Sequence, residues 1–403
     1  MPDSATEVRD LHSGTPVWPA LRVPAEILAA PVVADVVVLG AGVTGAMVAE
    51  AATAAGLSTV VLDRRPPGRG STAASTALLQ FEIDTPLIEL ADEIGFEDAR
   101  RAWLRSYAAV QDLGQKVRAL EIDCAFRDRT ALYLAGNQLG PLDLANEARL
   151  RRSIGLPSLY LSSRELKSYA GIDRPAAVLS QGAADVDPVR LAAGCLARAV
   201  SRRARVYSPV NVAEVVPRAQ HVQLVTDTGI ELTGRALVFA TGYELADGVP
   251  SKGHQRTSTW AFASPPQPHN LWPYQDVIWE ASEPYLYIRT TEDGRIIVGG
   301  EDEQFDDETA RDAALPRKIA ALQAKAKALL PAIDATAAYT WAGTFGESDT
   351  GLPSIGPVPG MPNCYAVLGY GGNGITFSVV ASQIIQKMLC GLDDPDADLF
   401  AFR

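Results

Sequence analysis

The chain has 403 residues and a formal net charge of −12, and 47% of its residues are hydrophobic. This length exceeds what one compact core usually holds, so we expect about two domains. The acidic balance argues against nucleic acid and anionic membrane surfaces as partners, and no apolar run is long enough to predict a membrane span. The four cysteines include no Cys-x-x-Cys pair and the four histidines show no ligand spacing, which predicts no metal site and a reducing, cytoplasmic setting.

The first 34 residues carry prolines and acids without the basic and apolar blocks of a signal peptide. We therefore expect residues 1–34 to form an irregular N-terminal arm. An apolar strand follows over residues 36–39, and it leads into the first pattern that indicates a function.

That pattern is Gly40-x-Gly42-x-x-Gly45, followed by a helix of small residues and a second apolar strand that ends at Asp63. It is typical of a βαβ unit that binds a dinucleotide. Gly40 permits a tight turn, Gly42 lets the backbone approach a pyrophosphate, and Gly45 lets the helix pack close to the sheet. The helix N-terminus offers free N–H groups to phosphates, and Asp63 can accept hydrogen bonds from a ribose. The alternative interpretation is an α/β turn without a ligand.

Later elements follow from apolar periodicity and turn signals. Asp187-Pro188 predicts the cap and first turn of a helix that runs to about residue 204. The remaining predictions are a short helix capped within 71–75, helices over 85–120, 141–153, 309–330 and 374–390, and strands within 205–240, 277–299, 336–344 and 364–368. This order predicts an α/β fold in which a Rossmann-like domain is interleaved with an α+β domain that contains an antiparallel sheet.

Three further segments have the composition of nucleotide contacts. The segment Gly70–Ser75 offers hydroxyl groups and free amides just beyond Asp63, although an ordinary helix cap would look the same. Thr241-Gly242 ends a strand with small residues. The turn over 369–376 leads into the last helix, where its amides can stabilise negative charge, although a glycine-rich turn often has no ligand.

In this order and spacing, GAGVTG, LDRR, GSTAAS, ATGYE and GLPSIGPVPGMPNCYAVLGYGGNGIT resemble the D-amino-acid-oxidase-like family of FAD-dependent oxidoreductases. That family includes glycine, sarcosine and γ-glutamylputrescine oxidases, and the resemblance covers nearly the whole chain after residue 34. It implies hydride transfer to flavin N5 from a C–H next to nitrogen, hydrolysis of the resulting imine, and reoxidation by oxygen or another acceptor. It also implies an FAD-binding domain and a substrate domain, and the order of the predicted elements places the first in 35–84, 180–250 and 340–395 and the second in 85–179 and 251–339.

The resemblance assigns FAD to residues from these motifs and from the strands around them. They are Gly40, Gly42, Gly45, Asp63, Arg64, Ser71, Thr72, Ser75, Val210, Thr241, Gly242, Gly371, Gly372, Asn373, Gly374, Ile375 and Thr376. The cysteine and histidine that attach flavin covalently in some relatives have no counterpart here. We therefore expect non-covalent FAD.

The chain departs from the family pattern where amino-acid oxidases hold the substrate carboxylate. Phe345 stands at the position of the usual arginine, two residues after the Gly of an Ala-Gly pair. Arg289 is a possible replacement anchor, because it alternates with Tyr285 and Tyr287 along one strand and so shares their face. The alternative is an exposed surface arginine. Asp302, just past that sheet, could pair with an ammonium group or could be solvated.

A small-molecule amine is the expected substrate, since a carboxylate against Phe345 would lack a cation. Two alternatives stay open, an FAD-dependent dehydrogenase of a hydroxy acid or polyol and a flavin-bound subunit without catalysis of its own. The lysine that assists oxygen reduction in sarcosine oxidases is replaced by apolar residues near Ile296 and Ile297, so a dehydrogenase is as open as an oxidase.

Overall fold

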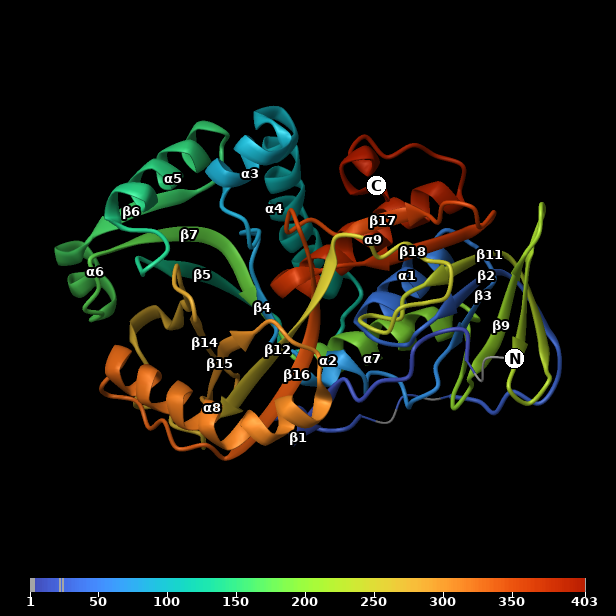
Figure 1. The fold of residues 1–403 in the computed structure, drawn as a ribbon, viewed down its shortest axis with the longest axis horizontal. Coiled ribbons are helices and arrows are strands. Elements are labelled where there is room, and N and C mark those ends of the chain that lie inside the picture. The colour runs from blue at the N-terminus through green and yellow to red at the C-terminus, as the bar shows by residue number, and fades with distance from the viewer. Residues whose placement is uncertain (1–3, 22, 24, 403) are drawn as a thin grey trace.

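The computed structural model describes residues 4–21, 23 and 25–402, and within these ranges the chain forms two large β-sheets with helices packed on them (Figure 1). Both sheets are assembled from segments far apart in the sequence, so the two units are interleaved. The α/β architecture expected from the sequence is confirmed.

The first sheet has a parallel centre that contains the fingerprint strands. Its order is β17-β18-β11-β2-β3-β8, and the β9–β10 hairpin extends β11. Val36, Val37 and Val38 are at most 1% exposed, as expected for strands covered on both faces. Helix α1 (Val43–Ala54) packs between α7 (Pro188–Ser201) and α9 (Gly374–Leu389). The strands are β2 (Val32–Leu39), β3 (Thr59–Leu62), β8 (Arg205–Tyr207), β9 (Val212–Pro217), β10 (Val222–Thr226), β11 (Glu231–Phe239), β17 (Ser354–Pro357) and β18 (Cys364–Leu368).

The second sheet is mostly antiparallel, with the order β1-β16-β12-β15-β14-β13-β5-β7-β4 and with β6 paired to β7. Helix α8 (Glu308–Leu329) packs on β12, β15 and β16, and Figure 1 shows α5 (Pro141–Ser153) and α6 (Ser163–Ala170) at the opposite end of this sheet. The strands are β1 (His12–Gly14), β4 (Leu78–Leu79), β5 (Arg127–Leu134), β6 (Ser158–Ser162), β7 (Ala176–Asp185), β12 (His254–Ala263), β13 (Val277–Glu280), β14 (Leu286–Thr290), β15 (Ile296–Glu303) and β16 (Tyr339–Ser348).

The predicted helices are confirmed with small shifts at their ends. The Asp187 side chain accepts hydrogen bonds from the amides of Val189 and Arg190, each at 2.9 Å, and so caps α7 as expected. The single helix expected over 85–120 is instead two, α3 (Leu87–Ile94) and α4 (Phe96–Ala119), because Gly95 between them has a φ of +90°. Short 3₁₀ turns lie at Pro273–Gln275, Gly371–Asn373 and Ala397–Phe400.

Two predicted domain boundaries fall inside strands. Position 180 lies in β7 and position 340 lies in β16, and both strands belong to the second sheet. The arm over residues 1–34 is not irregular throughout, because β1 pairs with β16 and the Glu7 amide donates to the carbonyl of Leu245 at 2.9 Å. These partners lie in distant parts of the chain, so local sequence patterns give no sign of the pairing.

One hydrophobic cluster connects the two units. It contains Phe81, Trp103 of α4, Trp341 of β16 and Phe377 of α9, each at most 1% exposed. Because the cluster takes side chains from both sheets, packing holds the sheets in a fixed relation to each other. None of the helices in the described ranges is long and apolar enough to cross a membrane.

Candidate active site

A cavity of about 520 Å³ is lined by residues of both sheets. Leu39, Leu62 and Ala240 stand at or just past the carboxyl ends of β2, β3 and β11, and all three line it. Ligands of parallel α/β sheets bind outside these strand ends, where loops and helix N-termini converge. The cavity therefore begins where the fingerprint predicts a dinucleotide.

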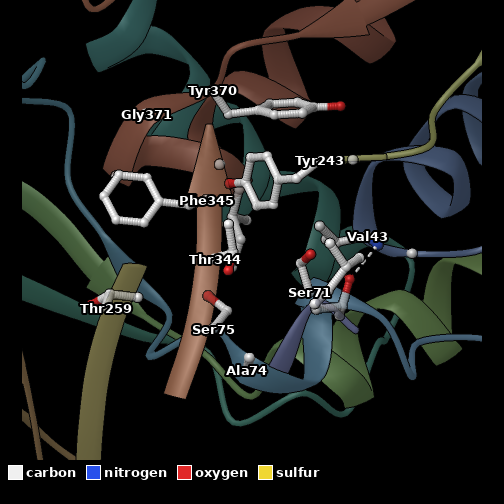
Figure 2. A pocket seen from close by; sticks show the side chains of 18 of the residues that line it. Val43, Ser71, Ala74, Ser75, Tyr243, Thr259, Thr344, Phe345, Tyr370 and Gly371 are labelled. Atoms are coloured by element: carbon white, nitrogen blue, oxygen red, sulfur yellow. Dashed lines mark hydrogen bonds between the residues drawn. The ribbon is translucent and has the colours of Figure 1, made fainter. Parts of the chain in front are cut away.

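The glycines of the fingerprint are required by close backbone contacts. Gly40 has a φ of +114°, and a Cβ there would lie 2.2 Å from the carbonyl oxygen of Ala240. A Cβ on Gly45 would lie 1.8 Å from the carbonyl oxygen of Gly40, so α1 approaches the strand end too closely for any side chain. Gly42 is the N-cap of α1, and the Val43 amide donates to Thr72 Oγ1 at 2.9 Å (Figure 2). The N-terminus of α1 therefore faces the cavity with its positive dipole end.

A second short helix, α2 (Ser71–Ala74), stands opposite the N-terminus of α1. Figure 2 shows Ser71 and Ser75 on this segment, and both line the cavity. The Ser71 hydroxyl is buried and has no hydrogen-bond partner among the residues that the structure describes. Buried polar groups are normally paired, so this hydroxyl suits a ligand with acceptor oxygens between the two helices.

Asp63 keeps the expected position but has protein partners of its own. Its carboxylate accepts hydrogen bonds from the amides of Ala41 and Arg65, each at 2.7 Å. Burial raises its pKa even though both hydrogen bonds act to lower it. The next residue but one, Arg65, forms two 2.7 Å hydrogen bonds with the carboxylate of Glu244.

The N-terminal arm crosses this end of the cavity. Arg64 donates to the Glu7 carbonyl at 2.9 Å, Arg65 donates to the Arg9 carbonyl at 2.6 Å, and Thr6 and Leu11 line the cavity. The arm thus becomes part of the wall of the predicted ADP site. Its contribution could not be seen in the sequence, because none of its residues belongs to a recognised pattern.

The glycine turn before α9 is tied to the segment over 80–84. The Gly372 amide donates to Asp84 Oδ2 at 2.7 Å, and the Asn373 side chain donates to the Glu82 carbonyl at 2.7 Å. Thr376 Oγ1 donates to the Gln80 carbonyl at 2.8 Å. Asn373 and Thr376 therefore hold the turn in place, and the Gly372 amide, expected to face the cofactor, is used by Asp84.

The structure brings the predicted cofactor residues together. Of the set assigned above, those that do not line the cavity are Gly45, Asn373 and Thr376, which pack or support the neighbouring backbone. Val210 and Thr241 line it beside Asp63, and Gly371, Gly372, Gly374 and Ile375 line it near the second sheet.

Aromatic side chains form the opposite end of the cavity. Tyr287 reaches it from β14 and Tyr285 from the position just before that strand, and Trp279 stacks on Tyr133 at 3.7 Å between ring centroids. Tyr287 has room because its strand neighbour is Gly299, where a Cβ would lie 2.3 Å from the Tyr287 hydroxyl. Phe345 extends from β16, with Thr259 on the adjacent strand β12 (Figure 2).

Acidic groups accompany these aromatic rings. Burial, together with the charge of Asp84, raises the pKa of Glu347 to about 7, and burial raises the pKa of Asp302 to about 6. The Tyr285 hydroxyl donates to Asp302 Oδ2 at 2.5 Å, and burial raises the Tyr285 pKa well above its usual value. Tyr285 is therefore a neutral phenol that orients Asp302.

Arg289 is not the substrate anchor that the strand pattern suggested. Its guanidinium is 2% exposed, pairs with Asp185 at 3.4 Å and donates to the Val186 carbonyl at 2.9 Å. It also lies over the Trp18 ring and is absent from the cavity wall. Arg289 lies on the same face of the strand as the two tyrosines, but it is in the part of β14 that lies beyond the cavity.

Sequence reasoning missed Asp84, Glu89 and Glu347 as cavity residues. Glu347 had a readable signal, because it follows Phe345 by two positions and strand alternation puts both on one face. Asp84 had none, since its partner Gly372 is distant in the sequence.

The comparisons with known proteins agree with this site. A family model described as "FAD dependent oxidoreductase" matches residues 35–388. The chain belongs to this DAO family. It is 23% identical over 391 residues to gamma-glutamylputrescine oxidoreductase of Escherichia coli, a match that covers 94% of this chain and 88% of that protein.

Solved structures show the same fold. Glycine oxidase from Geobacillus kaustophilus aligns with a TM-score of 0.75 and 20% identity, covering 92% of this chain and 98% of that one. L-proline dehydrogenase from P. horikoshii aligns with a TM-score of 0.76 and 16% identity, covering 92% and 97%.

Family membership makes the chain an FAD-dependent oxidoreductase. The cavity fits that cofactor, since the unpaired Ser71 hydroxyl and the N-terminus of α1 suit its pyrophosphate.

Proposed function

We propose that the protein oxidises a C–N bond of a primary or secondary amine, or of an amino-acid derivative that carries its carboxylate away from the reacting carbon. The observation that carries the proposal is the composition of the cavity beyond the FAD site. There, Tyr285, Tyr287, Trp279 and Phe345 enclose a space whose charged groups are carboxylates. Aromatic rings and carboxylates both attract amines.

When bound, FAD would supply the electron acceptor for the hydride of the C–H bond, the amine nitrogen would lose a proton, and water would convert the imine to a carbonyl compound and ammonia, or a smaller amine where the substrate is a secondary amine. The chain's own groups bind and orient the amine. The aromatic rings keep bulk water from the reacting carbon.

The printed name of the Escherichia coli relative supports an amine as substrate class, and the name of the P. horikoshii structure supports a dehydrogenase as well as an oxidase. A hydroxy acid is disfavoured, because its carboxylate would face Asp84 and Glu347. We also propose that FAD is held without a covalent bond. Acid precipitation tests this, since the yellow colour should stay in the supernatant.

Anaerobic titration of the holoenzyme tests the proposed reaction. Amines, N-methyl amino acids, D-amino acids and 2-hydroxy acids are added separately while the visible flavin absorbance is followed. Loss of that absorbance with an amine is the expected result. Loss with a hydroxy acid alone would refute the proposal, and stable absorbance with every donor would favour a flavin-bound subunit without catalysis.

A further inference from the structure

The two ends of the cavity differ in charge: one end has both cationic and acidic side chains, and the other has acidic side chains alone. At the ADP end, Arg64 and Arg65 accompany Asp63 and Glu244, and Arg65 and Glu244 pair directly. At the other end, the charged wall residues are Asp84, Glu89, Glu280 and Glu347, and among the described residues of the wall no lysine, arginine or histidine joins them.

Three of these four carboxylates lack a compensating cation. Glu280 pairs with Arg174 at 2.8 Å. Within the part of the chain that the structure describes, Asp84, Glu89 and Glu347 form no ion pair within 4 Å, and Glu347 accepts only a 3.2 Å hydrogen bond from Thr257. Glu347 is half-buried, whereas Asp84 and Glu89 are exposed, and the charge of Asp84 acts on Glu347. Neighbouring carboxylates without a cation repel each other, so this end of the cavity favours a positive ligand.

Two arginines close to β16 and β14 do not change this balance. Arg311 donates to Asp312, to the Asp10 carbonyl and to Thr344 Oγ1 at 3.0 Å, from helix α8. Arg289 is engaged by Asp185 and the Val186 carbonyl. Neither lines the cavity, so neither is placed to receive a substrate carboxylate.

Strand β16 shows how the preference is built. Phe345 and Glu347 lie two positions apart, and both line the cavity. Asp84 lies at the glycine turn, where its Oδ2 would be 2.3 Å from a Cβ on Gly371. The charges of Asp84, Asp302 and Glu283 all act on Glu347, and each raises its pKa. The negative charges around Glu347 thus come from three other segments: Asp84 from the 80–84 segment, Asp302 from β15 and Glu283 from the 281–285 loop.

We propose that this end of the cavity, through Glu347 and Asp84, binds a second ammonium group, so that the enzyme prefers diamines and rejects substrates with a carboxylate in that place. The inference rests on the proposed amine oxidation, because it names the substrate class of the same site. One amine is oxidised at the cofactor, and the other is held as a cation by the carboxylates and the aromatic rings around them.

Binding to the oxidised holoenzyme separates this inference from the reaction itself. The visible spectrum of bound flavin is followed as 1,4-diaminobutane, n-butylamine or 4-aminobutanoate is added, which yields a Kd whether or not reduction follows. Anaerobic rapid mixing then gives reduction rates for the same compounds. We expect the diamine to bind about tenfold tighter than the monoamine, the size of one charged hydrogen bond, and the amino acid to bind most weakly.

Glu347→Gln and Asp84→Asn should each reduce the preference for the diamine over the monoamine about tenfold, because each removes one of the two carboxylates proposed to hold the second ammonium group. Glu214→Gln, at an exposed position on β9, is the matched control and should keep the preference. Equal binding of diamine and monoamine by the parent enzyme would overturn the inference, as would a preference that survives in Glu347→Gln, even if Asp84→Asn fails to fold. Reduction by monoamines without a diamine preference refutes the inference alone, whereas reduction only by hydroxy acids refutes the proposed function.

Discussion

Replacing Glu347 by Gln should stabilise the folded enzyme, and the gain should depend on pH. The side chain is half-buried, and burial with the nearby charge of Asp84 raises its pKa from 4.5 to about 7. A carboxyl group with a raised pKa in the folded state costs stability when it ionises. The cost is absent below the unfolded pKa, grows as the pH rises from 4.5 to 7, and is complete above 7.

The size of the effect follows from the pKa difference. A shift from 4.5 to about 7 corresponds to roughly 3 kcal/mol at pH 8, at 1.36 kcal/mol per pKa unit. Solvent reaches part of the side chain, which reduces the expected gain to about 1–2 kcal/mol. Gln keeps the shape of Glu and can still accept the hydrogen bond from Thr257. For a chain of this size, we expect Tm to rise by about 2 to 4 °C at pH 8 and by little at pH 5.

Thermal unfolding of the holoenzyme in excess FAD, at pH 5 and pH 8, measures this gain. Glu214→Gln, exposed on β9, controls for a general effect of lost negative charge and should change Tm at neither pH. A Glu347→Gln variant that is no more stable at pH 8, or that gains equally at both pH values, would show that ionised Glu347 carries no penalty in the fold.

Three further changes test the cofactor end. Thr72→Val removes the acceptor of the Val43 amide and should weaken FAD binding about tenfold in a fluorescence titration, whereas Thr72→Ser should restore it; equal affinity for all three proteins would contradict the assignment. Gly45→Ala places a Cβ 1.8 Å from the Gly40 carbonyl, so purified protein should be colourless or unfolded, and a yellow, stable variant would refute the close approach. Deleting residues 1–14 removes Thr6 and Leu11 from the cavity wall and should speed FAD release at least several-fold, measured as free flavin fluorescence after dilution; unchanged release would show that the arm does not retain the cofactor.

The ADP half of the site was predictable because its requirements are local. Gly45 is needed by a contact within one strand–turn–helix unit and Gly40 by the φ of +114° of its own turn, so the sequence pattern and the backbone demand coincide, although Gly40 also lies against the distant Ala240. The cap of α7 at Asp187 is local in the same sense. Apolar periodicity likewise predicted the helices, since each buries one face irrespective of its partner.

The substrate half depends on pairings that local patterns do not contain. Strands β5, β7 and β12 were not predicted. Asp84 accepts a hydrogen bond from the Gly372 amide, and these two residues are 288 positions apart in the sequence. Arg289 shows what strand alternation cannot predict. Alternation correctly places Arg289 on the same face of β14 as the tyrosines, but it does not show that this part of the strand lies beyond the cavity. Glu347 was predictable in principle, as it shares the face of Phe345 on β16.

The stability cost and the substrate preference have one physical origin. Asp84 and Glu347 repel each other across the wall of the cavity, and within the described residues no cation of the chain pairs with either. A bound ammonium group relieves that repulsion, so the free energy lost in the ligand-free fold is regained as binding energy. A neutral or anionic substrate end regains nothing. A substitution that removes this repulsion from the ligand-free enzyme, such as Glu347→Gln, must therefore also reduce the preference for a second cation. Tm at pH 8 and the Kd of the diamine thus measure the same interaction.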